Sequence, residues 1–221
     1  MAFARSDDFK SPDCRLSFAN GLFKARAGST EPGAKLKFGS TLIFPKSAMT
    51  AKTISYRGAL VSLQDIVAAV IVEQWGDKGL EKAKAGLIKS PFLPGDGKEA
   101  RNKKTGDLHG GMGPEVFFIR TQANADRPPV VSASHTAVIP ATEKEVYSGC
   151  YGFGAINFFA WNHPQNGDGI SCGIQSFYKK ADGESLGGSG GDPEKWLETV
   201  EDTGAAPAAT QGGAGASGLF G

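Results

Sequence analysis

Cysteine is scarce in this sequence, and its pattern excludes a disulfide framework. The 221 residues include only Cys14, Cys150 and Cys172, an odd number without close spacing, so we expect a reducing, cytoplasmic setting. Long hydrophobic runs are also missing, because no stretch approaches the ~20 apolar residues that a membrane span requires. Residues 1–10 lack the apolar run of a secretory signal. These absences exclude a secreted disulfide scaffold and a membrane protein.

A large excess of charge of one sign is missing as well. Lys and Arg number 24 and Asp and Glu number 23, for a net charge of +1. The charge is unevenly distributed along the chain. Residues 192–202 contain five acidic residues and one basic residue, Lys195, whereas residues 1–191 are mildly basic. A basic body before an acidic segment recurs in proteins that handle nucleic acid, although many enzymes carry a similar body charge.

Residues suited to metal binding or covalent catalysis are few and scattered. The cysteines and His109, His135 and His163 include no two at the spacing of metal ligands. No nucleophile elbow is present, and residues 187–191 lack the Gly-Lys-Ser/Thr ending of a phosphate loop. We therefore expect no metal, no cofactor and no catalytic activity.

Glycine, by contrast, is plentiful, and it divides the chain. There are 31 glycines, about twice the usual share of ~7%. Residues 187–191 have the composition of a flexible joint, and residues 203–221 are uncharged and rich in Gly and Ala, which cannot form a packed core. We predict a folded domain at residues 1–186 and a flexible, disordered tail at 187–221, acidic over 192–202.

Strand patterns dominate the predicted domain. Turn-bounded apolar segments predict strands at residues 35–44, 115–122, 147–162 and 169–179, with shorter ones near 15–18 and 53–60. One helix is well indicated, from the N-cap Ser62, with Asp65 completing a capping box, to Trp75. Residues 77–88 are a second helical candidate, and 89–113 has the polar composition of an extended surface loop. The predicted fold is mainly β, an OB-fold-like small β-barrel with one or two inserted helices.

Four stretches of this domain carry a resemblance to a known family. They are Arg15–Phe18 with Leu22–Phe23, Thr41–Lys46, Tyr147–Tyr151 running on to Asn157–Phe159, and Asp182–Gly188. In these stretches the chain resembles the OB-fold single-stranded DNA-binding proteins of tailed bacteriophages. The resemblance implies a non-catalytic protein that coats and protects single-stranded DNA during phage replication, recombination and repair, in the cytoplasm of the infected host.

The strand that follows Gly149 shows how such binding would work. In a pleated strand, alternate residues share a face, so Cys150, Gly152, Gly154, Ile156, Phe158 and Ala160 form a small apolar face suited to a barrel interior. The opposite face carries Tyr151, Phe153, Ala155, Asn157, Phe159 and Trp161. Rings in such a row stack bases regardless of their identity. The alternative is that these rings pack beneath the helix at 62–75.

Cations beside this row would contact phosphates. The candidates are Lys35, Lys37, Arg120, Arg127, Lys179 and Lys180, and Tyr56 with Arg57 forms a further stacking and phosphate pair. Together with Tyr151, Phe153, Asn157, Phe159 and Trp161 they make up the predicted DNA-binding set. Taken singly, each of the six strand cations is more often a solvated surface charge than a phosphate contact. Residues 98–104 hold a denser basic cluster, either a clamp over the strand or merely a soluble loop.

Two further expectations concern partners. The acidic segment 192–202 is a candidate docking site for replication or recombination proteins, and also a candidate DNA mimic that occupies the groove when DNA is absent. A homo-oligomer is a further candidate partner, because the sequence does not determine the oligomeric state. The alternative function, from another class, is a phage structural or interaction module that uses the same barrel to hold protein partners.

Overall fold

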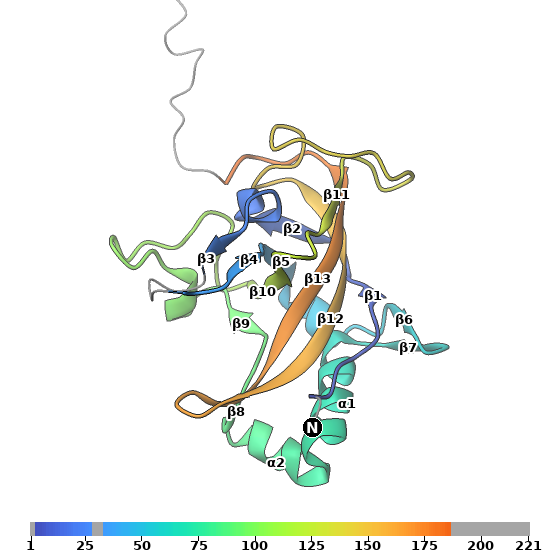
Figure 1. Cartoon of the computed structure of the whole chain (residues 1–221), viewed down its shortest axis with the longest axis vertical. Coiled ribbons are helices and arrows are strands. Elements are labelled where there is room, and N and C mark those ends of the chain that lie inside the picture. Colours follow the sequence, from blue (N-terminus) through green and yellow to red (C-terminus); the bar gives the residue numbers. More distant parts are fainter. Residues whose placement is uncertain (1–2, 28–32, 187–221) are drawn as a thin grey trace, which may run out of the picture. The chain divides into compact units, whose positions relative to one another are not determined.

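Five strands close a barrel in the computed structural model, which describes residues 3–27 and 33–186. They are β2 (Cys14–Ser17), β5 (Thr41–Pro45), β10 (Val116–Asn124), β12 (Tyr151–His163) and β13 (Gly167–Ala181). Around the barrel the order is β13–β12–β2–β5–β10, and β10 then returns to β13 (Figure 1). That closing pair is parallel, and the other four are antiparallel. Numbered along the chain, the strands follow the cyclic order 1-2-3-5-4 of an OB-fold, which confirms the predicted fold.

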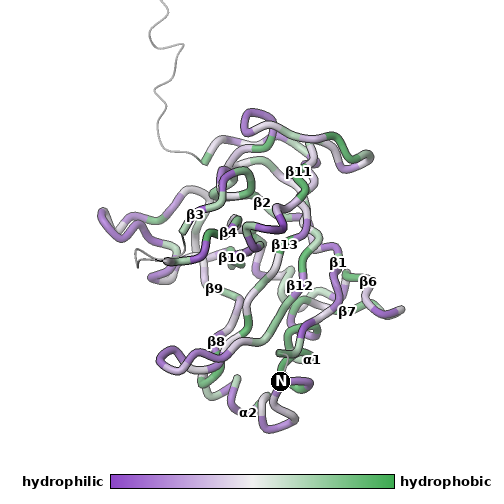
Figure 2. Tube along the Cα trace, in the orientation of Figure 1, coloured by the Kyte–Doolittle hydropathy of each residue, from purple (hydrophilic) through white to green (hydrophobic). Residues whose placement is uncertain are grey.

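Short strands extend the barrel at its rims. β1 (Phe9–Lys10) pairs with β12, β8 (Ile88–Lys89) and β11 (Val130–Ser132) pair with β13, β4 (Leu36–Phe38) and β9 (Leu93–Pro94) pair with β10, and β3 (Arg26–Ala27) pairs with β4. β6 (Ile54–Tyr56) and β7 (Ala59–Val61) form a separate hairpin. The tip of the long β12–β13 hairpin is hydrophilic (Figure 2). The described chain also contains the 3₁₀ turns η1 (Ala19–Leu22), η2 (Lys46–Met49) and η3 (Lys98–Ala100).

The barrel interior is lined as the alternation predicts. On β12, Gly152, Gly154, Ile156, Phe158 and Ala160 are all buried, and Cys150 and Cys172 are buried in the same core. The rings of Phe44 and Phe117 stack at 5.3 Å between centroids, and Phe92 packs edge-on against Phe158. Gly152 is tightly enclosed, because a Cβ there would overlap the Tyr178 carbonyl. The small residues therefore let the strand coil closely around the core.

The predicted helix is present and begins where its cap predicts. α1 (Leu63–Trp75) starts after Ser62, whose Oγ accepts from the Asp65 N–H at 3.1 Å, while the Asp65 carboxylate accepts from the Ser62 N–H at 2.9 Å. Its apolar face joins the core cluster that contains Ile156 and Phe158. α2 (Asp77–Lys84) follows and is shorter than the 77–88 segment expected from the sequence.

Three local expectations were wrong, each because of a tertiary contact. The strand expected at 35–44 is broken at Gly39, which packs against the Thr121 carbonyl so closely that a Cβ would overlap it. The strand expected from Tyr147 begins at Tyr151, because Gly149 turns the chain at φ 122° against the Glu184 carbonyl. The segment 89–113 is more than a surface loop, since Ala100 is fully buried against Ile43 and Phe118.

Other expectations fall outside what the structure covers. The predicted tail at residues 187–221, with its acidic and Gly/Ala-rich parts, lies outside the described residues, so the domain boundary at 187 stays a prediction. Within residues 3–27 and 33–186, no helix has the length and apolar character needed to cross a membrane.

Candidate nucleic-acid interface

The outer face of β12 carries the aromatic row that the alternation predicts. Phe153, Phe159 and Trp161 are half-buried there, and Tyr151 is exposed. Because α1 shares its core cluster with the inner face of the strand, the alternative in which these rings pack beneath the helix is wrong. The rings stand on the barrel exterior, where a ligand can reach them.

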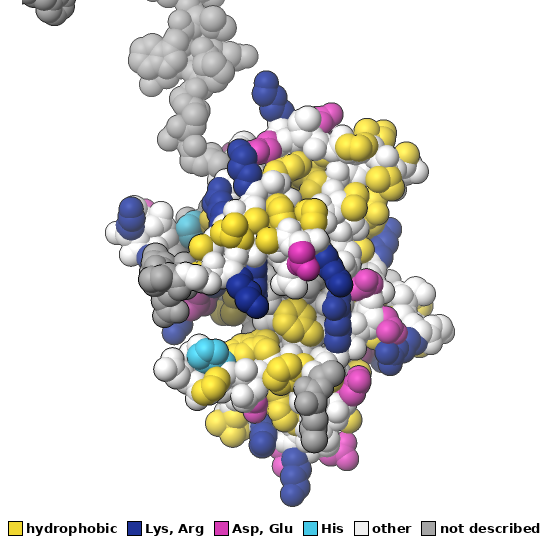
Figure 3. Space-filling model, viewed as in Figure 1, with side chains coloured by type: hydrophobic (Ala, Val, Ile, Leu, Met, Phe, Trp, Pro, Cys, Tyr) yellow, Lys and Arg dark blue, Asp and Glu magenta, His cyan; other side chains and the backbone are white. Residues whose placement is uncertain are grey.

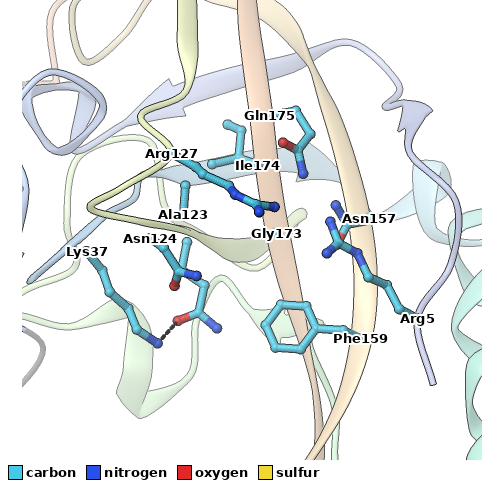
Figure 4. A pocket seen from close by; sticks show the side chains of 11 residues that line it. Arg5, Lys37, Ala123, Asn124, Arg127, Asn157, Phe159, Gly173, Ile174 and Gln175 are labelled. Atoms are coloured by element: carbon cyan, nitrogen blue, oxygen red, sulfur yellow. Dashed lines mark hydrogen bonds between the residues drawn. The ribbon is translucent and has the colours of Figure 1, made fainter. Parts of the chain in front are cut away.

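A pocket of about 280 Å³ opens on this face, where β10, β13 and β12 lie side by side. We call it the amide pocket, because Gln122, Asn124, Asn157 and Gln175 line it together with Phe159, Arg5, Lys37 and Arg127. Figure 4 shows the Arg5 and Arg127 side chains extending toward each other from opposite sides, with the Phe159 ring at one end. Its lining therefore combines amides, a ring and three cations.

Pairing between strands brings these side chains together from distant segments of the chain. Arg5 reaches the pocket because it bridges to Phe159 as an antiparallel partner of β12. Lys37 arrives through the pairing of β4 with the end of β10, and its Nζ donates to Gln122 Oε1 at 2.7 Å (Figure 4). Arg127 lies in the turn that follows β10.

Asn157 is fully buried at the floor of the amide pocket, whereas the sequence placed it in an open row. Its Nδ2 donates to the Asp8 carboxylate at 2.7 Å, and its Oδ1 has no hydrogen-bond partner among the described residues. Gly173 lies opposite, and a Cβ there would come within 2.7 Å of Oδ1. Asn157 therefore forms part of the floor of the amide pocket, and its Oδ1 is an acceptor without a described hydrogen-bond partner there.

A second pocket of about 530 Å³ surrounds Trp161, and we call it the tryptophan pocket. Trp161 pairs with Gly169 across the hairpin, and its indole lies so close to Gly169 that a Cβ would overlap the ring. Lys89 Nζ is 5.8 Å from the indole centroid. In the same pocket, the Arg120 guanidinium lies 3.2 Å from the Glu99 carboxylate and donates to the Glu99 carbonyl at 2.9 Å.

The two pockets are neighbours along the same strands. Phe159 and Trp161 are two residues apart on β12, as are Gln122 and Arg120 on β10, and two strand residues span about 6.8 Å. We call the two pockets together the cationic groove. Its described lining contains Arg5, Lys37, Lys89, Lys98, Arg120 and Arg127, and a single carboxylate, Glu99. Figure 3 shows Lys and Arg side chains flanking a hollow with hydrophobic atoms at its base.

The groove thus gathers Lys37, Arg120, Arg127, Asn157, Phe159 and Trp161 from the predicted set. Lys35 is exposed two residues before Lys37 and is outside the lining. Tyr56 and Arg57 lie apart on the β6–β7 hairpin. There the Tyr56 hydroxyl accepts from the Asp7 N–H, and Arg57 Nε donates to the Asp7 carboxylate at 2.7 Å. The hydrogen bond from Arg57 lowers the pKa of the Asp7 carboxyl.

The remaining predicted residues cluster at the other end of β12. Phe153 stacks on Tyr178 at 5.3 Å between centroids, and Lys10 Nζ is 4.0 Å from the Phe153 centroid. Arg15 lies over Tyr151, with 5.6 Å from its Cζ to the ring centroid. Two lysines here already have carboxylate partners at 2.6 Å, with Lys179 on Asp182 and Lys180 on Asp13. A role for this end in binding stays a prediction.

Several lining residues escaped the sequence analysis. Gln122 and Asn124 alternate outward with Arg120 on β10, so the period of two could have indicated them. Gln175 sits where the β12–β13 register shifts, and no sequence pattern marks that irregularity. Arg5 and Lys89 reach the groove only through tertiary pairing.

The cysteine thiols lie in the protein core. Cys14 and Cys172 are fully buried, and burial raises the pKa of both thiols. Across the described ranges, no three or more His, Cys, Asp or Glu side chains gather in a way that could hold a metal ion.

Comparisons with known proteins identify a family for this chain and related structures. The model of a family described as the single-stranded DNA-binding protein of Enterobacter phage Enc34 matches residues 9–204. The solved structure of the bacteriophage Enc34 protein in complex with single-stranded DNA is 19% identical, with a TM-score of 0.50, over 80% of this chain and 88% of that one. At this identity the likeness concerns the fold.

The chain is also similar to two other phage proteins. The single-stranded DNA-binding protein gp2.5 of bacteriophage T7 is 13% identical over 92% of this chain and all of that one, with a TM-score of 0.44. A putative protein p50 of Acyrthosiphon pisum secondary endosymbiont phage 1 is 27% identical over 125 residues. That match covers 55% of this chain and 60% of the relative's length.

Proposed function

The chain belongs to the single-stranded DNA-binding protein family of phage Enc34, and from this membership we propose that it coats single-stranded DNA through the cationic groove. The strand is bound without chemical change, during phage DNA replication, recombination and repair in the host cytoplasm. The resemblance drawn from the sequence is confirmed at the level of the family. The solved Enc34 complex, whose fold this chain shares, contains single-stranded DNA.

The observation that carries the proposal is the pair of outward rings on β12. Phe159 and Trp161 share one face, two residues apart, and each lies at a pocket flanked by cations. Every base has a π-face, so stacking binds single strands of any sequence, at ~1–3 kcal/mol per base. In a duplex the base faces are already occupied. The rings therefore favour single-stranded over double-stranded DNA.

The phosphates of the same strand would be bound by the flanking cations. Arg5 and Arg127 enter the amide pocket from opposite sides, and Lys37 lies at its edge (Figure 4). In the tryptophan pocket Arg120 contacts Glu99, whose carboxylate is the only one among the described lining residues. Guanidinium groups form bidentate hydrogen bonds with phosphate, so a DNA phosphate can replace this carboxylate on Arg120.

The chemistry of the lining also supports binding without catalysis. Among the described residues, the ionisable groups of the groove are Lys and Arg side chains and the Glu99 carboxylate, which already pairs with Arg120. Amides at the pocket floor can both donate and accept, so they meet base edges of any kind. We propose that Phe159 and Trp161 stack bases while Arg5, Lys37, Arg120 and Arg127 bind phosphates.

A fluorescence-anisotropy titration of labelled oligo-dT, with duplex of equal length as competitor, tests the proposal. We expect tight binding to the single strand and weak competition by duplex. The log–log salt slope should be about −0.7 for each phosphate contacted. Phe159→Ala and Trp161→Ala should each weaken binding about 5- to 150-fold, the equivalent of one stacked base. Leu60→Ala, at an exposed position on the β6–β7 hairpin, is the control and should bind as wild type.

Two outcomes would contradict the proposal. Wild-type affinity in both ring variants, with the fold intact by circular dichroism, would remove the rings from the site. No binding of oligo-dT at low salt would exclude the DNA function and favour the alternative of a barrel that holds a protein partner.

A further inference from the structure

Phe18 has a backbone conformation that its side chain does not favour. It directly follows β2 and lies in the left-handed region, at φ 54° and ψ 41°. Among the described residues, only Phe18 and Arg57 combine a positive φ with a side chain other than glycine. A bulky residue there is a genuine outlier, and such strain collects at functional sites. Phe18 is also 45% exposed, so much of its hydrophobic surface remains in contact with water.

The core requires the turn at this position but not the ring. Ala19 and Leu22, within η1, are buried, and the Ala19 N–H donates to Ser148 Oγ at 3.0 Å. Gly21 packs directly on the Gly39 carbonyl, which fixes the course of the chain after the turn. Glycine or asparagine would make this turn at lower cost. The structural role of residue 18 therefore leaves its aromatic ring unexplained.

The ring forms one wall of a third pocket, of about 210 Å³, which we call the phenylalanine pocket. Its other lining residues are Thr41, Glu99, His109, Met112, Phe118 and Arg120. The His109 ring meets Phe18 at 80°, with 5.1 Å between centroids, and so braces it from one side. The rings of Phe18, His109 and Phe118 and the polarisable sulfur of Met112 give this lining a part that suits a flat π-system.

Arg120 and Glu99 join this pocket to the cationic groove. Both residues line the phenylalanine pocket and the tryptophan pocket. Arg120 also lies over the Phe118 ring, with 5.7 Å from its Cζ to the centroid. A strand that stacks a base on Trp161 and passes Arg120 therefore arrives at Phe18.

We propose that the phenylalanine pocket is a further nucleobase-binding position, in which a base of the bound single strand stacks on Phe18. The phosphate between this base and the one on Trp161 binds Arg120 in place of the Glu99 carboxylate. The inference rests on the proposed function and lengthens its binding site. It also gives the strained turn a role, because the turn holds the ring rigidly at the end of the groove and little entropy is lost on stacking.

A length series of oligo-dT tests the position. Phe18→Asn removes the ring but keeps a residue that tolerates the left-handed conformation. We expect it to bind long oligonucleotides about 5- to 150-fold more weakly than wild type, the effect of one stacked base. The shortest oligonucleotides that wild type binds should be unaffected, because they fill only the cationic groove. Trp161→Ala should weaken both, and Leu60→Asn, the matched exposed control, should weaken neither.

Photocrosslinking locates the contact independently. Oligo-dT with a single 5-iodouracil, moved along the strand, should crosslink to Phe18 or His109 from a position different from the one that crosslinks to Trp161. Wild-type affinity of Phe18→Asn for long oligonucleotides, or crosslinks that never include residues 18 or 109, would overturn this inference and leave the groove intact. If wild type binds no oligo-dT of any length, the proposed function itself falls.

Discussion

The contact between Trp161 and Gly169 offers the sharpest test of the groove. The indole lies so close to Gly169 that a methyl group there would overlap it. Gly169→Ala should therefore displace the ring without removing it. The two residues are cross-strand partners in a regular part of the β12–β13 ladder. The half-buried indole can turn outward, so we expect the barrel to fold as before.

The expected loss of DNA affinity follows from the base stacking that the displaced indole no longer provides. A base stacked on an aromatic side chain contributes ~1–3 kcal/mol, which corresponds to about 5- to 150-fold in Kd. Since Gly169→Ala keeps the indole, its loss should approach but not exceed that of Trp161→Ala. Gly113→Ala is the matched control, because a Cβ there meets nothing within 4 Å.

Anisotropy titrations of wild type, both single variants and the double variant form a thermodynamic cycle. In the Trp161→Ala background the added methyl group meets no ring, so Gly169→Ala should cause no further loss of affinity. Additive losses in the double variant, or wild-type binding by Gly169→Ala alone, would refute the idea that Gly169 positions Trp161 for stacking.

Three other expectations follow from individual residues. Arg127→Ala should make the log–log salt slope of binding shallower by about 0.7, whereas Lys78→Ala on α2 should leave the slope unchanged. Ser62→Ala should lower the free energy of unfolding by about 1 kcal/mol in denaturant titrations. A hydrogen bond from the Ser62 N–H, which Ser62→Ala keeps, lowers the pKa of the Asp65 carboxyl in the folded protein, so this carboxylate contributes stability that is fully present above its unfolded pKa. That contribution should be lost in both proteins as pH falls through the folded pKa, and an Asp65→Asn variant that loses as much stability in acid as wild type would contradict this origin. Cys172 should react with Ellman's reagent only on unfolding, because burial raises its pKa and blocks access; rapid reaction of this thiol in the native protein would disprove that.

Much of the fold was predictable because its signals are local. The capping box at Ser62 and Asp65 involves residues within one helical turn, and the structure reproduces it. The two faces of β12 follow from a period of two within one strand, and the buried face is the one expected. The family resemblance likewise rested on short stretches of sequence, and the family match confirms it.

The groove was predictable only in part, because it is assembled from distant segments. Phe159 and Trp161 could be found from their strand, but Arg5 reaches the same pocket across more than 150 residues of chain. The pairing of opposite charges is also non-local. Lys180, a predicted phosphate contact, has Asp13 as its partner in this structure. No pattern within a single segment indicates such a contact.

The sequence by itself determined which residues form the small apolar inner face of β12, where α1 begins, and which family the chain resembles. These properties depend on neighbours within a few residues, and side-chain periodicity encodes them directly. Only the tertiary structure decided that β10 closes on β13, that Gly39 breaks a strand, and that Phe18, Arg120 and Trp161 line adjoining pockets. Each of these features depends on segments that are far apart in the chain, and the closure of the barrel brings those segments together.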